Sequence, residues 1–361
     1  MRYVILFTGG RSGSKLLHSL FDNHPEIANF PGIFKFSKDT IKMFEIKDPK
    51  KFVEKFIDLN PEFFDSRLNK IHRQNKLGKN KNKFYVVNKK LFKSKFISYF
   101  KKTKKKNIDR LKFLHLAYMY VNNSKIKPKI ILLHLHLFET FSNYLQTFKV
   151  NKKTKILIMY RDPIISMCST IKNWLKYDQG RHMTPRAIYA NYQSHFNIFN
   201  NLKNYKNLTR VVKLENLHTK GKKTMKKICK FIGIKFNRNL LKSTFMNMAW
   251  WGDSVSKKYI SGLNPNFKNN FDKKIFLTQE LIFIENRIIE ILLKYKYPIR
   301  STILLKEKKN FYKLFEFEKK FYKINLGKFK LKTKLSIIFF YLKRVMFFYK
   351  NFPKYNLPEE I

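Results

Sequence analysis

Four short apolar runs, each about the length of one β-strand, constrain the fold of this chain more than any other feature. Runs of four to eight apolar residues with little alternation are typical of strands that are covered on both faces. Helical patterns lie between the runs, so the sequence predicts an α/β fold with a central parallel sheet flanked by helices. The expected strands are Met1–Phe7, Lys129–Leu137, Thr154–Tyr160 and Arg210–Leu214, and the expected helices are 14–23, 107–123, 164–176, 184–205 and 222–232.

The charge of the chain needs a separate explanation. Lys and Arg number 77 against 24 Asp and Glu, which gives a formal net charge of +53, while 44% hydrophobic residues exclude wholesale disorder. Only 13 of the 77 positive residues are Arg, the residue best suited to bidentate phosphate contacts. The lysine surplus therefore favours a solvated surface over a nucleic-acid-binding face, and we do not expect nucleic acid as a partner.

Two segments depart from the α/β pattern. Residues 76–106 carry 13 Lys and no acidic residue, which predicts a solvated insertion. Residues 301–361 carry 15 basic and 5 acidic residues, and we expect a basic, aromatic helical extension of a main domain that spans residues 1–300. Within it, Leu335–Tyr349 is apolar except for Lys343 and Arg344. This pattern predicts either a helix at an anionic membrane surface or, slightly favoured, a helix docked on the main domain or on a second copy.

Signals for export are absent from the sequence. The first apolar run stops at a glycine-rich turn and is too short for a secretory signal, and no run reaches the ~20 apolar residues of a membrane span. Two cysteines, Cys168 and Cys229, are too few for a disulfide framework or a four-cysteine zinc site. We therefore expect a cytoplasmic protein, with the inner face of the membrane as the alternative location through the extension.

The turn after the first strand carries the clearest chemical signal. Glycines allow a backbone to approach an anion closely, and the helix that follows offers unpaired N–H groups and the positive end of its dipole. Two serines add hydroxyl groups and two basic residues add charge, so the turn predicts a phosphate-binding loop. The loop residues that we expect to bind the ligand are Gly10, Arg11, Ser12, Gly13, Ser14, Lys15 and Leu16.

This loop does not match the two commonest nucleotide-binding patterns. Counting from Gly9, Ser14 stands where a Walker loop has its second glycine, and Leu16 replaces the hydroxyl residue that binds Mg²⁺. The glycine spacing also differs from the GxGxxG pattern of dinucleotide-binding folds. A nucleotide-dependent kinase remains an alternative, but one without its expected magnesium ligands.

The stretch Gly10–Leu17, followed by Asp22–Ile27, resembles the opening of the sulfotransferases that use 3'-phosphoadenosine 5'-phosphosulfate (PAPS). The resemblance implies a P-loop-like sulfotransferase architecture, PAPS as co-substrate and no metal. It further implies that the loop binds the 5'-phosphosulfate and that Arg11 steadies the leaving phosphate. Ser14 matches a hydroxyl position of the family, whereas Lys15 departs from the commoner Thr. The resemblance covers roughly residues 1–35 and 126–290.

Three later segments extend this resemblance. Arg161 ends a strand and Ser169 follows eight positions later, with an Asp-Pro between them, which resembles the family's 3'-phosphate site. Residues 210–217 with 225–234 resemble a structural strand, turn and helix of the family. Lys257 and Lys258 lie where the family has a loop over the nucleotide, although the usual Arg-Lys-Gly triplet is absent.

Sulfuryl transfer needs a proton acceptor for the attacking group and positive groups around the leaving phosphate. His134 and His136 lie two residues apart in one strand and therefore on the same side of it. The spacing from Pro128 in the family favours His134 as the base, but orientation does not separate the two. We therefore expect His134, His136 and Arg11 to be the catalytic residues.

The acceptor is not identified by the sequence. A hydroxyl or amine on a carbohydrate, a lipid head group or a tyrosine is compatible with it. A second alternative of another class is a noncatalytic protein that binds polyanions or a membrane surface through its basic residues.

Overall fold

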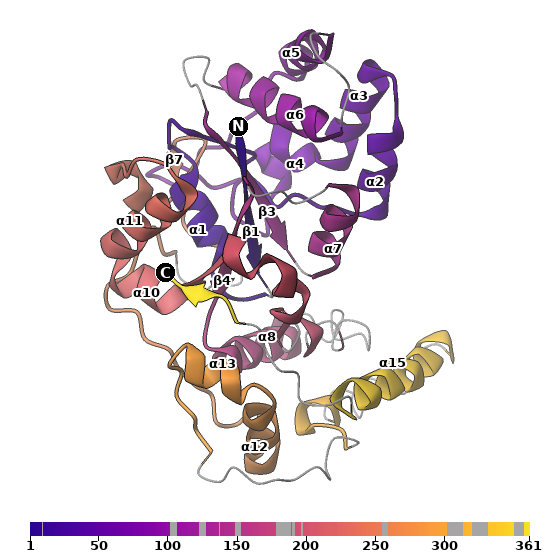
Figure 1. The fold of residues 1–361 in the computed structure, drawn as a ribbon, viewed down its shortest axis with the longest axis vertical. Helices are drawn as coiled ribbons and strands as arrows, with labels where there is room; N and C mark the ends of the chain where they lie inside the picture. Colours follow the sequence, from indigo (N-terminus) through magenta and orange to yellow (C-terminus); the bar gives the residue numbers. More distant parts are fainter. Residues whose placement is uncertain are drawn as a thin grey trace.

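A parallel sheet forms the centre of the molecule, as the sequence predicts. The computed structural model describes residues 1–8, 10–101, 107–122, 128–136, 138–148, 153–177, 189, 192–195, 198–254, 259–301, 313–319, 331–349 and 357–361. Six strands lie in the order β2-β3-β1-β4-β5-β8, and each neighbouring pair is parallel (Figure 1). The strands are β1 (Arg2–Thr8), β2 (Ile27–Asn29), β3 (Ile130–His136), β4 (Lys155–Tyr160), β5 (Thr209–Lys213) and β8 (Glu359–Glu360), and β6 (Thr244–Phe245) pairs with β7 (Met248–Ala249) in a separate antiparallel hairpin.

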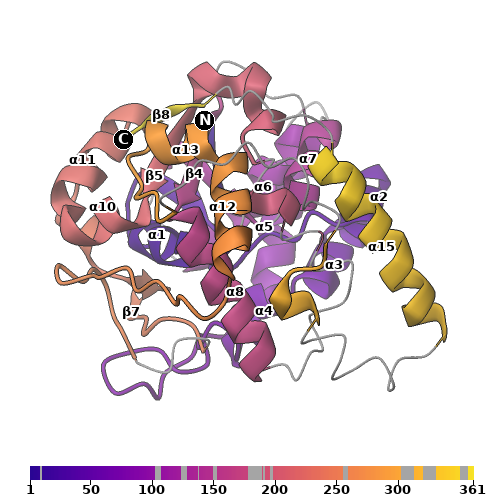
Figure 2. The same ribbon diagram turned by 90° about the horizontal axis from the view of Figure 1, so that it is seen from below.

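Helices cover both faces of the sheet (Figures 1 and 2). Four of the five predicted helices are confirmed, as α1, α6, α8 and α11, while the predicted helix over residues 184–205 lies mostly outside the described residues. The helices are α1 (Ser14–Phe21), α2 (Lys38–Glu45), α3 (Pro49–Leu59), α4 (Pro61–Phe64), η1 (Ser66–Leu68), α5 (Lys89–Lys101), α6 (Asn107–Asn122), α7 (Phe138–Thr147), α8 (Pro163–Tyr177), η2 (Asn200–Leu208), α10 (Leu214–Thr219), α11 (Gly221–Ile232), η3 (Arg238–Leu241), α12 (Thr278–Arg287), α13 (Ile289–Lys294) and α15 (Leu331–Tyr349).

The two faces of the sheet build two different cores, because successive residues of a strand point to opposite sides. On one face, Val4 and Leu6 of β1 pack with mainly aliphatic residues of α1, α10 and α11. On the other face, Ile5 and Phe7 pack into a core that is rich in phenylalanine and extends through α2 to α7. The loop between β1 and α1 therefore starts from a strand that is fully buried on both sides.

The lysine-rich segment 76–106 differs from the solvated insertion that we predict from its charge. Helix α5 packs against α6 and α3, and its Phe92, Phe96 and Phe100 are buried in the main core. These phenylalanines recur every four residues and form one face of the helix. Lys89 and Lys90 are exposed at the start of the helix and Lys93 and Lys95 are half-buried beside this face, so the lysine count conceals an amphipathic helix.

The basic region after residue 300 is partly helical, as expected, and it also contributes to the main sheet. Strand β8 lies beside β5, where the Ile361 amide donates to the Val211 carbonyl at 2.9 Å and Arg210 pairs with Glu359 at 3.1 Å. These residues are therefore an edge of the main sheet. Within the described part of the chain, no helix has the length and apolar character needed to cross a membrane.

Candidate active site

The loop between β1 and α1 has a backbone shape that depends on glycine. Gly13 has a φ of +79°, and a Cβ placed there would come within 2.4 Å of Leu214 Cδ1. Arg11 also has a positive φ, of 40°, and the Ser12 hydroxyl donates to the Gly10 carbonyl at 2.6 Å. The turn thus brings its backbone into the tight curve that leads to the N-terminus of α1, the geometry in which main-chain amides can hold an anion.

A cavity of about 410 Å³, which we call the loop cavity, lies directly against this turn. Six of the seven predicted loop residues line it, together with Arg161 from the end of β4. Its remaining walls come from segments far apart in the sequence. The residues that line the loop cavity are Arg11, Ser12, Gly13, Ser14, Lys15, Leu16, Ile33, Ile71, His72, His136, Arg161, Leu214, His218, Trp250, Gly252, Asp253, Ile260, Gly262, Asn264 and Phe267.

The three cations at this cavity are held differently. Arg11 lies 3.6 Å from Asp253, and its buried Nε has no hydrogen-bond partner in the described structure. The Lys15 ammonium points to the base of the loop, where it donates to the Pro31 carbonyl at 3.0 Å and lies 4.5 Å from the centre of the Phe245 ring. Burial lowers the pKa of Lys15 to about 7, so this residue contributes less than the full charge that we expect from its type.

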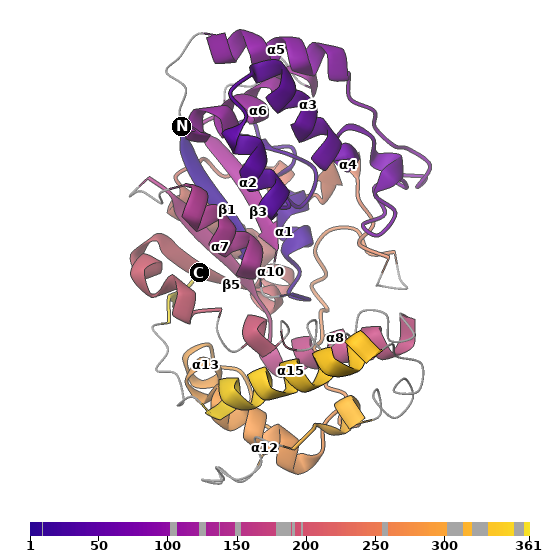
Figure 3. The ribbon, with the colours of Figure 1, turned by 90° about the vertical axis from the view of Figure 1, so that its right-hand side faces the viewer.

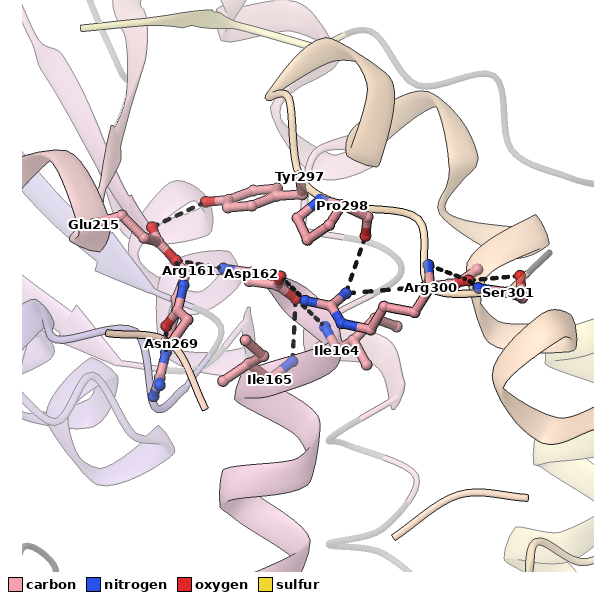
Figure 4. A network of polar contacts seen from close by, with 11 residues as sticks. Arg161, Asp162, Ile164, Ile165, Glu215, Asn269, Tyr297, Pro298, Arg300 and Ser301 are labelled. Carbon is pink, nitrogen blue, oxygen red and sulfur yellow. Dashed lines mark hydrogen bonds and ion pairs between the residues drawn. The ribbon is translucent and has the colours of Figure 1, made fainter. Parts of the chain in front are cut away.

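Arg161 is oriented by a carboxylate that belongs to another strand–helix junction. Its Nε donates to Asn269 Oδ1 at 3.1 Å, and Asn269 Nδ2 in turn donates to Glu215 Oε1 at 2.6 Å (Figure 4). Glu215 also accepts from the Asp162 amide at 3.1 Å and from the Tyr297 hydroxyl at 3.4 Å. Burial lowers the pKa of Arg161, and Glu215 opposes that effect. This arrangement positions the guanidinium at the cavity wall.

The turn that follows Arg161 is fixed by a second set of polar contacts. Asp162 Oδ1 accepts from the amides of Ile164 and Ile165 at 3.0 and 3.1 Å and so caps α8. Arg300 pairs with the other oxygen of Asp162, and the Arg300 amide donates to Glu285 at 2.9 Å (Figure 4). Asp162 and Glu285 are both buried. The segment around Arg300 therefore clamps the turn that carries Arg161.

The two serines of α8 differ in their relation to the loop. Ser166 is buried, and its hydroxyl donates to the Gly10 carbonyl at 3.2 Å. Ser169, the residue expected from the resemblance, is half-buried one turn further along and does not belong to the residues that line the loop cavity. Its role as a ligand residue remains a prediction.

His134 is enclosed beneath the loop. Its Nε2 lies 3.0 Å from Ser14 Oγ and its Nδ1 lies 3.1 Å from His18 Nδ1, so both ring nitrogens have partners. The imidazole is buried, and burial together with His18 and Lys15 holds the pKa of His134 well below its ordinary value. This side chain supports Ser14 from behind and does not line the cavity.

His136 has a different environment although it lies on the same side of β3. It lines the loop cavity, and its buried Nδ1 has no hydrogen-bond partner in the described structure. Burial, with Arg11 and Lys15 nearby, lowers the pKa of His136 to about 4, so the imidazole is neutral at pH 7.

A second cavity, of about 640 Å³, adjoins the first and is called here the side cavity. Four residues line both cavities: Ile33, Ile71, His72 and His136. His72 also has a buried Nδ1 without a partner in the described structure, and burial followed by the charge of Lys15 lowers its pKa to about 2. The side cavity is lined by Ile33, Phe34, Lys35, Phe36, Ser37, Pro61, Glu62, Leu68, Asn69, Ile71, His72, His136, Thr140 and Asn143.

A sequence model of the sulfotransferase family matches residues 4–238. The chain belongs to the sulfotransferase family. The matched residues include the loop Gly10–Leu16, both histidines of β3 and Arg161. The resemblance that these motifs carry is therefore confirmed at the level of the family.

Solved structures of sulfotransferase domains are also similar to this chain, at low identity. The domain from the Synechococcus PCC 7002 olefin synthase is 13% identical and covers 66% of this chain and 75% of its own, with a TM-score of 0.40. The domain from the curacin biosynthetic pathway is 13% identical over 91% of this chain and 98% of its own, with a TM-score of 0.36. STF9 from Mycobacterium avium is 11% identical over 66% and 65%, with a TM-score of 0.34. No curated protein matches this chain.

Several residues that line the cavities of this sulfotransferase are not predicted from its sequence. His72 precedes the lysine-rich segment in a loop without apolar periodicity, so nothing in its surroundings marks it. His218 also lines the loop cavity and stacks on Phe267 with a ring-centre distance of 4.5 Å. Lys257 and Lys258 lie outside the described residues, whereas Gly252 and Asp253 just before them line the cavity. The described residues contain no cluster of three or more His, Cys, Asp or Glu that could hold a metal ion.

Proposed function

We propose that this sulfotransferase moves the sulfuryl group of PAPS to a hydroxyl, or an amine, of an acceptor. One observation carries the proposal: the loop, Arg11 and Arg161 converge on one cavity, and His136, whose Nδ1 has no hydrogen-bond partner in the described structure, lines both this cavity and a second one. Sulfuryl transfer needs an anion cradle for the donor, a base for the acceptor proton and a pocket for the acceptor.

The loop cavity is suited to the donor. The amides of the loop and Arg11 would hold the phosphosulfate end, because a buried guanidinium nitrogen without a partner is stabilised by an anionic oxygen. Arg161 would hold the second phosphate, since burial disfavours its charge and a nearby anion would offset that cost. Lys257 and Lys258 remain candidates for the same phosphate, as predicted from the resemblance.

His136 is our candidate for the base, in preference to His134. Proton abstraction needs a free lone pair within reach of the acceptor, and His134 uses both of its nitrogens in contacts beneath the loop. His136 is neutral at pH 7, and the negative charge of a bound donor would raise its pKa toward the working range. In the proposed reaction, the acceptor oxygen bonds to sulfur, the bond from sulfur to the bridging phosphate oxygen breaks, and His136 takes the acceptor proton.

The side cavity is suited to the acceptor. Most of its lining surface is apolar and comes from side chains such as Ile33, Phe34 and Phe36, while polar and charged groups of Lys35, Glu62, Asn69, Thr140 and Asn143 lie beside them. Apolar and aromatic surfaces bind ligands that have an apolar body, while a few polar groups orient them. Among the acceptors compatible with the sequence, this favours a hydroxyl on an aromatic or aliphatic body, such as a phenol, over a bare sugar.

The test is a calorimetric titration with 3'-phosphoadenosine 5'-phosphate, the expected product, with ATP plus Mg²⁺ as the control. Binding of the product, lost in Arg11→Ala and in Arg161→Ala, would support the proposal. Exposed Arg67 pairs with Asp65, lies over the Phe84 ring and lines neither cavity, so Arg67→Ala is a matched control and should bind like the parent protein. Preference for ATP with Mg²⁺ would instead favour the kinase, and binding of neither nucleotide would favour the polyanion or membrane binder.

A further inference from the structure

In the described structure, helix α15 contacts the rest of the molecule through the side that carries Phe340, Arg344 and Phe347. Phe340 and Phe347 each lie 6.0 Å from the Tyr189 ring, measured between ring centres. Arg344 is buried between them, where its Nη2 donates to the Lys313 carbonyl at 2.9 Å and its Nε lies 3.7 Å from Glu318. Residues at positions i, i+4 and i+7 share one side of a helix, so these contacts define the inner side of α15.

The opposite side of α15 is apolar and exposed. Among the described side chains of this helix, seven large hydrophobic ones are each more than half exposed, and at 3.6 residues per turn they fall on the side facing away from Arg344. Figure 2 shows the helix at the periphery of the molecule, and Figure 3 shows its full length running across the surface. The outer side consists of Leu331, Leu335, Ile338, Phe339, Leu342, Met346 and Tyr349.

Lysines border this apolar side on both edges. Helical geometry puts Lys334 along one edge and Lys343 along the other, and both side chains are exposed. The helix sequence contains four basic residues and no acidic one. A continuous apolar stripe with cationic edges is the pattern of a helix that lies in the interface of an anionic membrane, with its lysine side chains reaching the head groups.

We propose that the outer side of α15 binds the surface of an anionic lipid membrane and lies parallel to it. Charge selects this partner: the helix offers only positive groups around its apolar stripe, and the chain carries a formal net charge of +53. A second copy would bring the same lysines against these and repel them, whereas anionic lipids complement them. The helix is not apolar enough to span a membrane, so it binds on the surface. This proposal is independent of the proposed reaction.

Co-sedimentation with vesicles tests the proposal. We expect the full-length protein to bind phosphatidylcholine vesicles containing 30 mol% phosphatidylserine at least tenfold more tightly than pure phosphatidylcholine vesicles. Leu335→Glu with Leu342→Glu should reduce that binding at least tenfold, because it interrupts the apolar stripe without touching the inner side. Leu293→Glu is the matched control, since Leu293 of α13 is also exposed, and it should bind like the parent protein.

A second variant separates apolar from electrostatic binding. Lys334→Glu with Lys343→Glu should reduce the preference for phosphatidylserine, to which the rest of the positive chain also contributes, while changing the melting temperature little. Equal binding by the parent and the Leu335/Leu342 variant would overturn the proposal, as would a parent protein that binds neither vesicle. Sedimentation velocity supplies the remaining outcome: a dimer that the Leu335/Leu342 variant disrupts would assign this face to a second copy and reject the membrane.

Discussion

The loop cavity and the side cavity are built in different ways. The first depends on backbone shape and on charges gathered from several segments, since Arg11, Arg161 and Asp253 come from three separate loops. The second depends on side-chain bulk from two stretches near the N-terminus, around Phe34 and Leu68. A cavity fixed by backbone geometry tolerates few residue types, whereas a cavity fixed by apolar bulk changes its shape with each substitution. Donor binding should therefore be the rigid property of this fold, and acceptor choice the adjustable one.

The largest effect is expected from substituting His136, which lines both the loop cavity and the side cavity. His136→Asn should lower kcat by about 10²–10⁴-fold, because it removes the proposed base, while the affinity for 3'-phosphoadenosine 5'-phosphate stays within about threefold. His134→Asn should act differently and weaken product binding through Ser14. Steady-state kinetics and calorimetry on both variants provide the measurement. An unchanged kcat in His136→Asn would remove this residue from the mechanism.

The loop cavity can be damaged through its backbone alone. Gly13→Ala forces a side chain into a left-handed conformation that costs about 1–2 kcal/mol, and its Cβ would meet Leu214. We expect product affinity to fall about 100-fold. Combining it with Leu214→Ala should recover part of the loss by removing the contact but not the backbone cost. Full recovery in a titration of the double variant would mean that the backbone conformation is unimportant.

Acid should lower the free energy of unfolding through His136, which lines both cavities. The folded-state pKa of His136 is about 4, below the ordinary 6.5, so the unfolded chain binds more protons between these values. The free energy of unfolding therefore falls as the pH is lowered through 6.5 toward 4, and this one side chain accounts for about 2 kcal/mol between pH 7 and 5. Urea unfolding of the parent and His136→Asn at both pH values measures it. Identical pH dependence in the two proteins would contradict the assigned burial effect.

The smallest effect is expected in the side cavity. Leu68 lines this cavity and not the loop cavity, and its side chain is largely exposed. Leu68→Ala should raise KM for an aromatic or aliphatic acceptor several-fold, with product affinity and stability nearly unchanged. Lys38, an exposed residue outside both cavities, supplies the control Lys38→Ala. Equal changes in donor and acceptor KM would break the separation of the two cavities.

Local patterns in the sequence predict four of the six strands of the main sheet, four helices and the loop, because each is encoded by neighbouring residues. The different surroundings of His134 and His136 are not predictable this way. Strand alternation puts both histidines on the same side of β3. Only the tertiary structure shows that Ser14 and His18 contact His134, while His136 lines the loop cavity. His72 is missed for a related reason, since its loop becomes part of a wall only through contacts with distant segments.

Charge and composition predict burial poorly when the spacing of the apolar residues is not considered. The lysines of α5 suggest a solvated segment, yet Phe92, Phe96 and Phe100 bury one face of the helix. Strand β8 carries no apolar signal, because its residues are Glu359 and Glu360. They form a strand by pairing with β5, and their carboxylates lie near Arg210 and Lys213.

The pairing of β8 with β5 has a consequence for how the chain is synthesised. Strand β5 leaves the ribosome long before residue 359, so one of its edges stays open while about 150 further residues are added. An unpaired edge strand is a template for association with other chains. The order of synthesis therefore predicts a nascent intermediate in which this edge of β5 is exposed until the last strand of the sheet docks.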